Sequence, residues 1–362
     1  MKELIMIGKQ AADFQVVVYS EQYKSQTLSL LKLLWTSLDQ KQVSEYFKWR
    51  YEANPYAKFP LIILCVHAER VIGVLGHMVQ RLLIKGQTQN VCVPVDGYVM
   101  SDYRRYGVYS RMLEGGVKLI ESLIQEYDFK FYFNASSNMR SAIGLVNLGW
   151  KLLGPKMYMT KMSPKNILFE RLCKSAQDIR IVSFKKAQAG YILEVSNEFR
   201  DDIVKLNAIN SNSPICVLHD KVFYEWKYSY QKNNYQFVYL YKGSILVGYM
   251  VICKGSKYQY SIEEYSYTDI ASLKLMLTRI VRHMRIPIFR LFYLQQNKQE
   301  MRALTSLGFV TERLWILKLF NKSRSSVYFR HINDNKNATD YIQNEVNTLD
   351  VKNWKLFHAD IL

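Results

Sequence analysis

The sequence predicts an α/β protein with mixed sheets, arranged as two related halves. Three observations predict this class. Strand-like and helix-like runs alternate along the first half, several motifs of the first half recur in the second, and the composition supplies a large core, with 49% hydrophobic and 14% aromatic residues. A chain of 362 residues has room for two or three domains.

The elements of the first half follow from the spacing of its apolar residues. In order, we expect a helix over 26–38, a hairpin over 61–73, a strand over 91–100, a helix over 109–127, a strand over 129–133 and a helix over 139–148. Pro94 and Gly97 predict a bend or bulge inside the third of these elements. A strand–helix–strand order predicts parallel pairing between 95–100 and 129–133.

Three motifs of the first half recur in the same order in the second. They are Trp49-Arg50-Tyr51 as Trp226-Lys227-Tyr228, Gly73 as Gly248, and Asn138 with Gly149-Trp150 as Asn297 with Gly308-Phe309. The offset between copies falls from 177 residues at the tripeptide to 159 at the asparagine, so the second copy is shorter between its glycine and its asparagine. We therefore predict two domains, 1–162 and 163–362.

The charge predicts an anionic partner. Lys and Arg number 49 against 31 Asp and Glu, a net charge of +18, which suits a phosphorylated ligand, a nucleic acid or an acidic membrane surface, or simply a solvated cationic surface. Five cysteines without a C-x-x-C pair and six scattered histidines favour neither a disulfide framework nor a metal site. The first residues are too short an apolar stretch for a signal peptide, and no run is long enough to cross a bilayer. We expect a cytoplasmic protein.

The segment from Ser101 to Ser110 lies between a predicted strand and a predicted long helix. A loop there presents backbone N–H groups and the positive end of the helix dipole, which together form an anion site. Gly107 allows the backbone to approach a ligand closely, and Arg104 and Arg105 add charge. The segment predicts a diphosphate site; the alternative is an ordinary strand-to-helix turn with two solvated arginines.

This segment resembles the acyl-CoA signature R/Q-x-x-G-x-G/A of the GNAT N-acyltransferase superfamily, with Arg104, Gly107 and Tyr109 at its defined positions. The resemblance implies two tandem GNAT-like domains, each a mostly antiparallel mixed sheet with a splayed parallel strand pair flanked by helices. It also implies acetyl-CoA as co-substrate and no metal. The coenzyme contacts that it implies are Tyr98, Val99, Met100, Arg104, Arg105, Tyr106, Gly107, Val108, Tyr109, Ser110 and Asn138.

The sequence departs from the family pattern at two positions. Tyr109 stands where the family prefers Gly or Ala, so its ring either crowds the phosphate loop or turns outward. Leu145 stands where many members carry a Tyr that protonates the departing thiolate, and a leucine has no proton to give. The second half has no R-x-x-G-x-G segment at all, so we expect a degenerate domain that binds no CoA. It resembles the second halves of tandem GNAT enzymes, and this resemblance implies that it completes the acceptor cleft.

The implied reaction transfers an acyl group from a thioester to an amine, which needs a base for the ammonium proton and a donor to the carbonyl. Asp96 is the acid nearest to the loop, His77 lies on the hairpin, and Tyr132 lies on the partner strand with Asn134. Asp96, His77 and Tyr132 are the candidate catalytic residues. Asp96 and His77 also have structural interpretations, a surface or bulge carboxylate and a strand or core histidine, and Asn134 is interpreted as a helix cap.

The first hypothesis is an acetyl-CoA-dependent N-acetyltransferase acting on a primary amine of a small acceptor, such as an amino sugar or a nucleotide-linked amino sugar. A Fem-type aminoacyltransferase that uses aminoacyl-tRNA has the same tandem arrangement, and the positive charge suits tRNA. A non-catalytic module that binds CoA or nucleic acid is the third hypothesis, favoured by Leu145.

Overall fold

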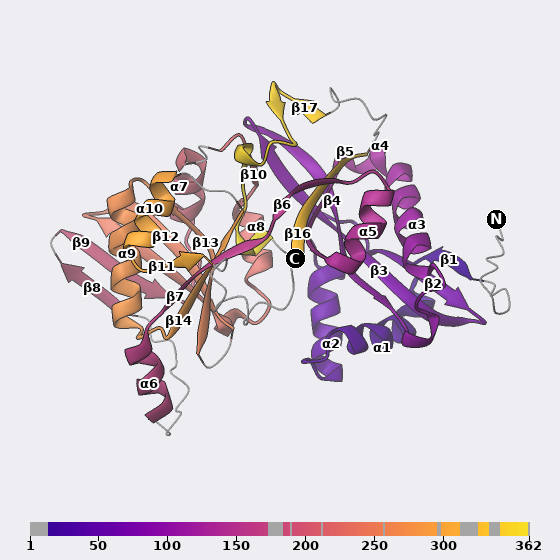
Figure 1. Cartoon of the computed structure of the whole chain (residues 1–362), viewed down its shortest axis with the longest axis horizontal. Coiled ribbons are helices and arrows are strands. Elements are labelled where there is room, and N and C mark those ends of the chain that lie inside the picture. The colour runs from indigo at the N-terminus through magenta and orange to yellow at the C-terminus, as the bar shows by residue number, and fades with distance from the viewer. Residues whose placement is uncertain are drawn as a thin grey trace. The chain divides into compact units, whose positions relative to one another are not determined.

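The computed structural model describes residues 14–172, 184–188, 190–210, 213–255, 258–294, 298–311, 325–332 and 341–360. The chain folds into two compact units. The first comprises residues 1–154 and 325–349, and the second comprises residues 155–324 and 350–362. Figure 1 shows each unit as a sheet flanked by helices.

The first unit is built around one mixed sheet. Its elements are β1 (Gln15–Val18), α1 (Lys24–Leu34), α2 (Gln40–Phe47), β2 (Leu61–His67), β3 (Arg70–Ile84), β4 (Gln87–Val99), α3 (Val108–Ser122), α4 (Ile124–Tyr127), β5 (Phe129–Asn138), α5 (Met139–Asn147), β6 (Lys151–Pro155), β16 (Ser325–His331) and the small pair β17 (Ile342–Gln343) and β18 (Val346–Asn347). The strand order is β1-β2-β3-β4-β5-β16-β6. The apolar runs of β2 and β3 are almost wholly buried, because α1 and α3 pack on this sheet.

The strands β4 and β5 form the parallel pair of the first unit, and they diverge. They pair only where Asn90, Val91 and Cys92 meet Phe129, Phe131 and Tyr132. The predicted parallel pairing is confirmed, but the predicted partner 95–100 is wrong, because that half of β4 has already left β5. On its other edge β5 pairs antiparallel with β16, from Asn138 against Ser325 to Phe131 against His331.

The second unit repeats much of the element order of the first. Its elements are β7 (Met157–Met162), α6 (Pro164–Leu172), β8 (Phe184–Gln188), β9 (Tyr191–Ser196), α7 (Asp202–Asn210), β10 (Ile215–Val217), α8 (Lys221–Lys227), β11 (Tyr235–Lys242), β12 (Ile245–Lys254), β13 (Gln259–Tyr267), α9 (Ile270–His283), β14 (Ile288–Tyr293), α10 (Lys298–Ser306), β15 (Val310–Thr311) and β19 (Trp354–Lys355). The order of its main sheet is β15-β7-β14-β13-β12-β11-β9-β8, and β13 and β14 are its parallel pair.

The duplication extends to single packing contacts. In the first unit Gly73 of β3 lies under Met112 of α3, whose Sδ is 2.9 Å from the place of a Cβ at Gly73. In the second unit Gly248 of β12 lies in the same way under Met276 of α9, at 3.8 Å. The β12–β13 hairpin of the second unit is shorter than the β3–β4 hairpin of the first. The strands β12 and β13 have 10 and 9 residues, whereas β3 and β4 have 15 and 13.

Each unit includes a strand from outside its predicted range of the chain, so a single cut at 162/163 does not separate the two units. The strand β7 precedes the predicted boundary but pairs with β14 of the second unit, from Ile288 against Met162 to Tyr293 against Met157. The strand β16 comes after the second unit in the chain but completes the sheet of the first (Figure 1). The difference has a physical reason: an open sheet edge accepts any strand that satisfies its N–H and C=O groups, wherever that strand lies in the chain.

The chain's last residues fold into the second unit through a buried histidine. His219 Nδ1 lies 2.5 Å from Glu264 Oε2 of β13, and its Nε2 lies 2.6 Å from Asp360 Oδ1 near the C-terminus. The ring stacks on Phe223, and all three charged groups are buried. Asp360 also accepts a hydrogen bond from the backbone N–H of Phe357 at 2.7 Å.

Within the residues that the structure describes, no helix has the length and apolar composition to cross a bilayer. The same residues hold no group of three or more His, Cys, Asp and Glu side chains placed to bind a metal ion.

Candidate functional site

The strand β4 carries a bulge just before it ends. Val74 of β3 faces Tyr98 and Gly76 faces Val95, so Leu75 alone opposes both Asp96 and Gly97. Asp96 adopts a left-handed backbone with φ of 52°, a conformation that Asp tolerates better than most residues. The bend that Pro94 and Gly97 predict is thus confirmed, and it lies in the half of β4 that diverges from β5.

Three donors hold the carboxylate of Asp96. Arg50 Nε donates to Oδ2 at 2.5 Å, the Tyr51 hydroxyl donates to the same oxygen at 2.7 Å, and Trp35 Nε1 donates to Oδ1 at 3.2 Å. The Arg50 and Asp96 side chains are only 4% and 10% exposed. Burial, together with the charge of Asp96, raises the pKa of Tyr51 well above its usual range. The three donors therefore hold the Asp96 side chain in place and fix the bulge.

The repeated tripeptide explains part of this arrangement. Arg50 and Tyr51 belong to the motif that recurs as Trp226-Lys227-Tyr228, and the second unit also has a bulge, at Glu263 of β13. Although burial opposes it, the charge and hydrogen bond of His358 and the charge of Lys227 hold the pKa of Glu263 below its usual range. In both units the basic residue of the tripeptide acts on the carboxylate at the bulge. The sequence showed the repeat but not this role.

The loop between β4 and α3 places a helix N-terminus at the surface. A 3₁₀ turn, Ser101–Tyr103, leads to Arg105 and Gly107, which both have positive φ, of 72° and 74°. Gly107 is exposed and is the N-cap of α3, so no capping side chain accepts the N–H groups of the first turn. These N–H groups and the helix dipole favour an anion from outside the protein.

Aromatic side chains anchor this loop. Phe14 makes edge contacts with the rings of Tyr103 and Tyr106, and the Tyr103 hydroxyl lies 3.2 Å from His67 Nδ1. The Met100 N–H donates to the carbonyl of Ile72 at 2.9 Å. The loop is therefore tied to β2 and β3 at several points, which holds the first turn of α3 in one place.

The two arginines of the loop differ in what they do. Arg104 turns back, donating through Nε to the carbonyl of Val99 at 3.1 Å and lying over the Tyr98 ring at 5.5 Å. It braces the end of β4 through these contacts. Arg104 and Arg105 are both exposed, so both guanidinium groups add positive charge at this loop.

Tyr109 turns inward. A Cβ placed on Gly97 would come 2.7 Å from Tyr109 Cε2, and one placed on Gly144 of α5 would come 3.8 Å from Tyr109 Cε1. The ring therefore lies between β4 and α5, against the backbone of the bulge. The sequence left open whether the ring crowds the phosphate loop or turns outward. It does neither, and instead packs beside the strand end that was expected to pair with the coenzyme.

The matching helix of the second unit, α9, has a side chain at its N-terminus. Thr268, whose N–H donates to the Val247 carbonyl as Met100 does to Ile72, is followed directly by Asp269. Asp269 is the N-cap of α9, and its carboxylate accepts from the N–H of Ser272 at 2.8 Å and from the Ser272 hydroxyl. These hydrogen bonds hold the pKa of Asp269 below its usual range. The carboxylate of Asp269 already occupies the N-terminus of α9, so a diphosphate placed there would meet a negative charge.

The structure places His77 and Tyr132 in the core rather than in a groove. His77 is 3% exposed, and its Nε2 lies 2.5 Å from the place of a Cβ at Gly116 of α3. Burial lowers the pKa of His77 to about 4. Tyr132 is 1% exposed, its hydroxyl donates to the Val117 carbonyl of α3 at 3.3 Å, and burial raises its pKa far above its usual range. Neither side chain reaches solvent.

Two further positions are also structural. The Asn134 amide donates to the Pro94 carbonyl at 3.3 Å, bridging β5 and β4 where they diverge. It is therefore not the helix cap that the sequence suggested. Leu145 is fully buried in α5, as its apolar side chain requires.

The remaining expected coenzyme contacts surround the same loop. Tyr98 and Met100 are partly exposed, Val99 and Val108 are buried, and Ser110 is exposed in the first turn of α3. Asn138 is the last residue of β5, and its side chain lies outside the described part of the chain. The loop, the end of β4 and the first turn of α3 therefore come together. Asp96 lies beside them in the bulge, whereas His77 and Tyr132 are buried in the core.

Comparison with solved structures shows which fold this is. The chain matches a probable N-acyltransferase from Enterococcus faecalis over 91% of its own length and 75% of the other, with a TM-score of 0.63 and 8% identity. It matches a GCN5-related N-acetyltransferase from Anabaena variabilis over 88% and 73%, with a TM-score of 0.61 and 11% identity. It matches a tandem GNAT protein from the clavulanic acid biosynthesis pathway over 89% and 99%, with a TM-score of 0.53 and 12% identity.

At these identities the shared property is the fold, and the fold is that of GNAT domains arranged in tandem. This confirms the fold class that the sequence predicts. No protein-family model matches the chain, and no curated protein matches its sequence.

Proposed function

We propose that this tandem GNAT protein is an acyl-CoA-dependent N-acyltransferase whose first unit binds acetyl-CoA and acetylates a primary amine of a small acceptor. One observation supports this most directly. The helix after the bulged strand begins at an exposed glycine without a capping side chain in the first unit, whereas in the second unit an aspartate caps the matching helix. Of these two matching helices, α3 leaves its N-terminus to an outside anion and α9 does not.

Each part of the loop then has a task. The first-turn N–H groups of α3 and the side chain of Arg105 hold the coenzyme diphosphate. The diverging end of β4 offers backbone groups to the arm that carries the thioester, and the bulge turns backbone N–H groups out of the β3 ladder toward the thioester carbonyl. Asp96 is a positioning residue in this scheme, because Arg50, Tyr51 and Trp35 already occupy both of its oxygens.

Proton transfer runs through solvent. A primary amine with a pKa near 10 is protonated at neutral pH and must lose a proton before it attacks. His77 and Tyr132 are buried and Leu145 is apolar, so none of the three exchanges protons with a substrate. Gly97 at the bulge is exposed, which lets water reach the reacting groups there. The net charge of +18 suits an acceptor that itself carries phosphate, such as a nucleotide-linked amino sugar.

Acetyl-CoA binding to matched glycine variants tests the site. Gly107→Glu puts an anion where the diphosphate sits and is expected to abolish binding measured by calorimetry. Gly86→Glu is the control, because Gly86 is also exposed and has a similar positive φ of 80°, but lies in the hairpin turn between β3 and β4. The two variants share the same backbone strain and the same added charge, and only Gly107 adjoins the proposed site.

The acyl-transfer step is tested with a panel of amines and a readout of free thiol. Thiol release that requires both acetyl-CoA and an amine, and that Gly107→Glu eliminates, supports the proposal. The absence of acetyl-CoA binding at millimolar concentration, or equal binding by the two glutamate variants, contradicts it. Retention of tRNA at 0.2 M salt without any response to CoA points instead to the Fem-type chemistry.

A further inference from the structure

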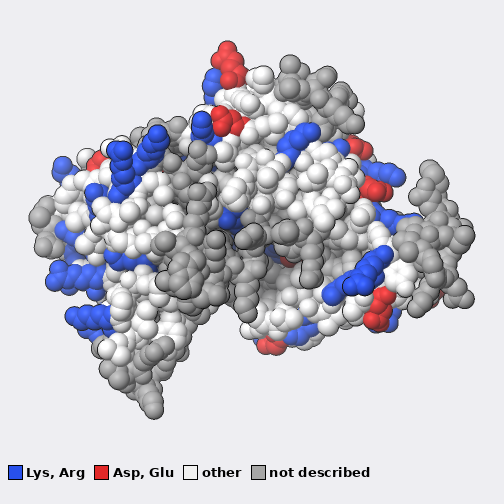
Figure 2. Space-filling view, in the orientation of Figure 1, with Lys and Arg blue, Asp and Glu red and all other residues white. Residues whose placement is uncertain are grey.

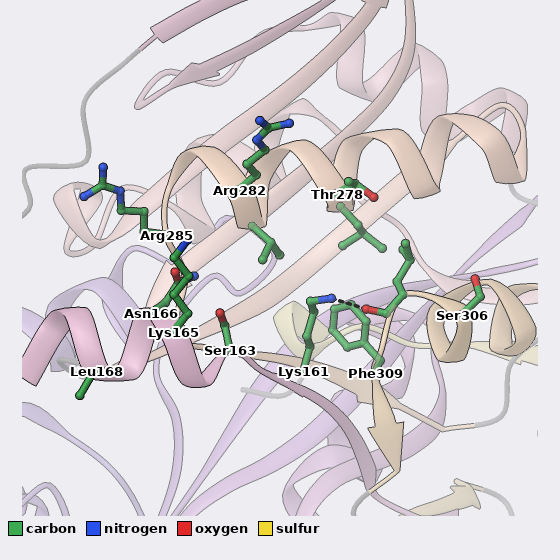
Figure 3. Close-up of a pocket in the computed structure, with 13 residues that line it drawn as sticks. Lys161, Ser163, Lys165, Asn166, Leu168, Thr278, Arg282, Arg285, Ser306 and Phe309 are labelled. Carbon is green, nitrogen blue, oxygen red and sulfur yellow. Dashed lines mark hydrogen bonds between the residues drawn. The ribbon is translucent and has the colours of Figure 1, made fainter.

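The second unit contains a pocket far from the N-terminus of α9. It is about 850 Å³ in volume, which lies within the range of small-molecule sites. Its walls come from the end of β7, the first turns of α6, the C-terminal half of α9 and the residues that follow α10 (Figure 3). Since α9 has 14 residues and rises about 1.5 Å per residue, the pocket lies at the opposite end of this helix from the position of a GNAT phosphate loop.

The pocket is lined by basic and apolar side chains. Four of its side chains are basic and none is acidic; the basic ones are Lys161, Lys165, Arg282 and Arg285. Its apolar side chains are Leu168, Leu277, Val281, Leu307 and Phe309. Leu277 and Phe309 are buried, while Leu168 is 57% exposed at the rim. A pocket of this composition favours a ligand that carries negative charge on an apolar body.

The basic residues do not contribute equally. The Lys161 ammonium donates to the carbonyl of Leu307 just beyond α10, so it closes the end of that helix. In Figure 3 the guanidinium groups of Arg282 and Arg285 both extend outward from the pocket, and of the two Arg285 lies at the same end of the pocket as Lys165 and Asn166. Lys165 and Arg285 are therefore the cations best placed to meet a charged headgroup. The N-terminus of α6 begins beside them and adds the positive end of its dipole.

The surrounding surface has the same sign. Figure 2 shows Lys and Arg gathered on the part of the second unit around α9, with few acidic side chains in view. Burial and the neighbouring charges of Lys186, Arg282 and Arg279 lower the pKa of His283, the last residue of α9. An anion that enters this pocket meets a favourable field.

We propose that this pocket binds an amphipathic anion, an aliphatic chain that bears a carboxylate or phosphate headgroup. The headgroup lies between Lys165 and Arg285, and the chain lies over Leu277, Val281 and Phe309. Leu168 at the rim covers the chain where it would meet solvent. The site is independent of the acyl-CoA site, because none of its residues belongs to the first unit.

Calorimetric titration of the full chain with short-chain amphiphiles below their micelle concentrations tests the proposal. Decyl phosphate and decanoate are the ligands, and octyl and hexyl phosphate shorten the chain. Affinity is expected to fall about four-fold for each methylene removed, since each buried methylene adds a roughly constant hydrophobic gain. Decyl phosphate against decanoate distinguishes the two headgroups, and the tighter one identifies the natural anion.

Two charge variants test the headgroup. Lys165→Glu is expected to weaken decyl phosphate binding at least about ten-fold, the factor that one lost charge-assisted hydrogen bond implies. Lys205→Glu is its control, because Lys205 is also an exposed helical lysine of the second unit but lies on α7, away from the pocket. Arg285→Asn is the second variant: Arg285 has a φ of 50°, and Asn adopts that conformation readily.

Several results overturn the proposal. They are the absence of saturable binding, wild-type affinity in both Lys165→Glu and Arg285→Asn, equally tight binding of decyltrimethylammonium, and equally tight binding of inorganic phosphate without a chain. The melting temperature of each variant shows that it is folded, so weakened binding reports on the pocket itself. Acetyl-CoA binding measured on the same samples is expected to stay unchanged.

Discussion

The buried ion pairs of His219 predict that the second unit loses stability as the pH rises above neutrality. Burial opposes the charged imidazole, but the charges of Glu264 and Asp360 outweigh it and raise the pKa of His219 to about 10. The pKa of an unfolded histidine is about 6.5. The folded chain therefore keeps a proton that the unfolded chain releases, so this stabilisation is fully present below pH 6.5 and disappears as the pH passes 10.

The size of the effect follows from the two pKa values. A difference of about 3.5 units, at about 1.4 kcal/mol each, amounts to about 5 kcal/mol. Between pH 6.5 and 10 the free energy of unfolding of this unit falls by about 1.4 kcal/mol for each pH unit. The other charged groups of the second unit, the Glu263–His358 pair included, remain in every sample. A variant at position 219 isolates the contribution of this one histidine.

His219→Gln is the variant, because glutamine carries donors but no titratable proton. At pH 7 it is expected to be less stable than wild type by about 3–5 kcal/mol, since two buried carboxylates lose their cation. This difference shrinks to near zero at pH 10. Hydrogen exchange in the segment 350–360, measured against denaturant, reports on the tail that Asp360 anchors. If wild type and His219→Gln lose stability in parallel from pH 7 to 10, the reasoning is refuted.

Two other variants test the first unit. Tyr109→Ala removes the ring that lies against Gly97, and it is expected to tighten acetyl-CoA binding several-fold in calorimetry; unchanged or weaker binding would show that the ring does not obstruct the coenzyme. Asp96→Asn leaves Arg50 buried without its anion and is expected to lower the free energy of unfolding of the first unit by about 3–5 kcal/mol. Adding Arg50→Met to Asp96→Asn restores part of this loss if the ion pair is its cause, which urea denaturation of the single and double variants measures.

The local pattern of the first half predicts its elements well. The helix expected over 109–127 is present as α3 and α4, with a break at Leu123, and the expected helix over 139–148 is α5. The bend at Pro94 and Gly97 is the bulge of β4. These features depend on residues close together in the chain, where apolar spacing and backbone preference act directly. The loop between β4 and α3, with Gly107, is likewise a feature of residues close together in the chain.

Features that depend on distant partners could not be predicted. The partner of Asp96 is Arg50, 46 residues away, and the repeat drew attention to Arg50 without showing what it contacts. His77 and Tyr132 looked accessible because alternation along a strand assigns two faces but does not say that α3 covers one of them. The strand β16 carries no local signal for its pairing with β5, since edge pairing uses backbone groups that every residue has.

The exchange of β7 and β16 has a consequence for how the protein is made. On the ribosome, the sheet of the first unit stays incomplete after β5 has emerged, until the whole intervening stretch has been translated and β16 follows. At typical synthesis rates this delay lasts roughly 10 to 35 s, during which β5 presents an unpaired edge to any passing chain. The edge of β5 is therefore open while nearly all of the second unit is being made, and the sheet of the first unit closes only shortly before the last residues, 350–362, complete the second unit.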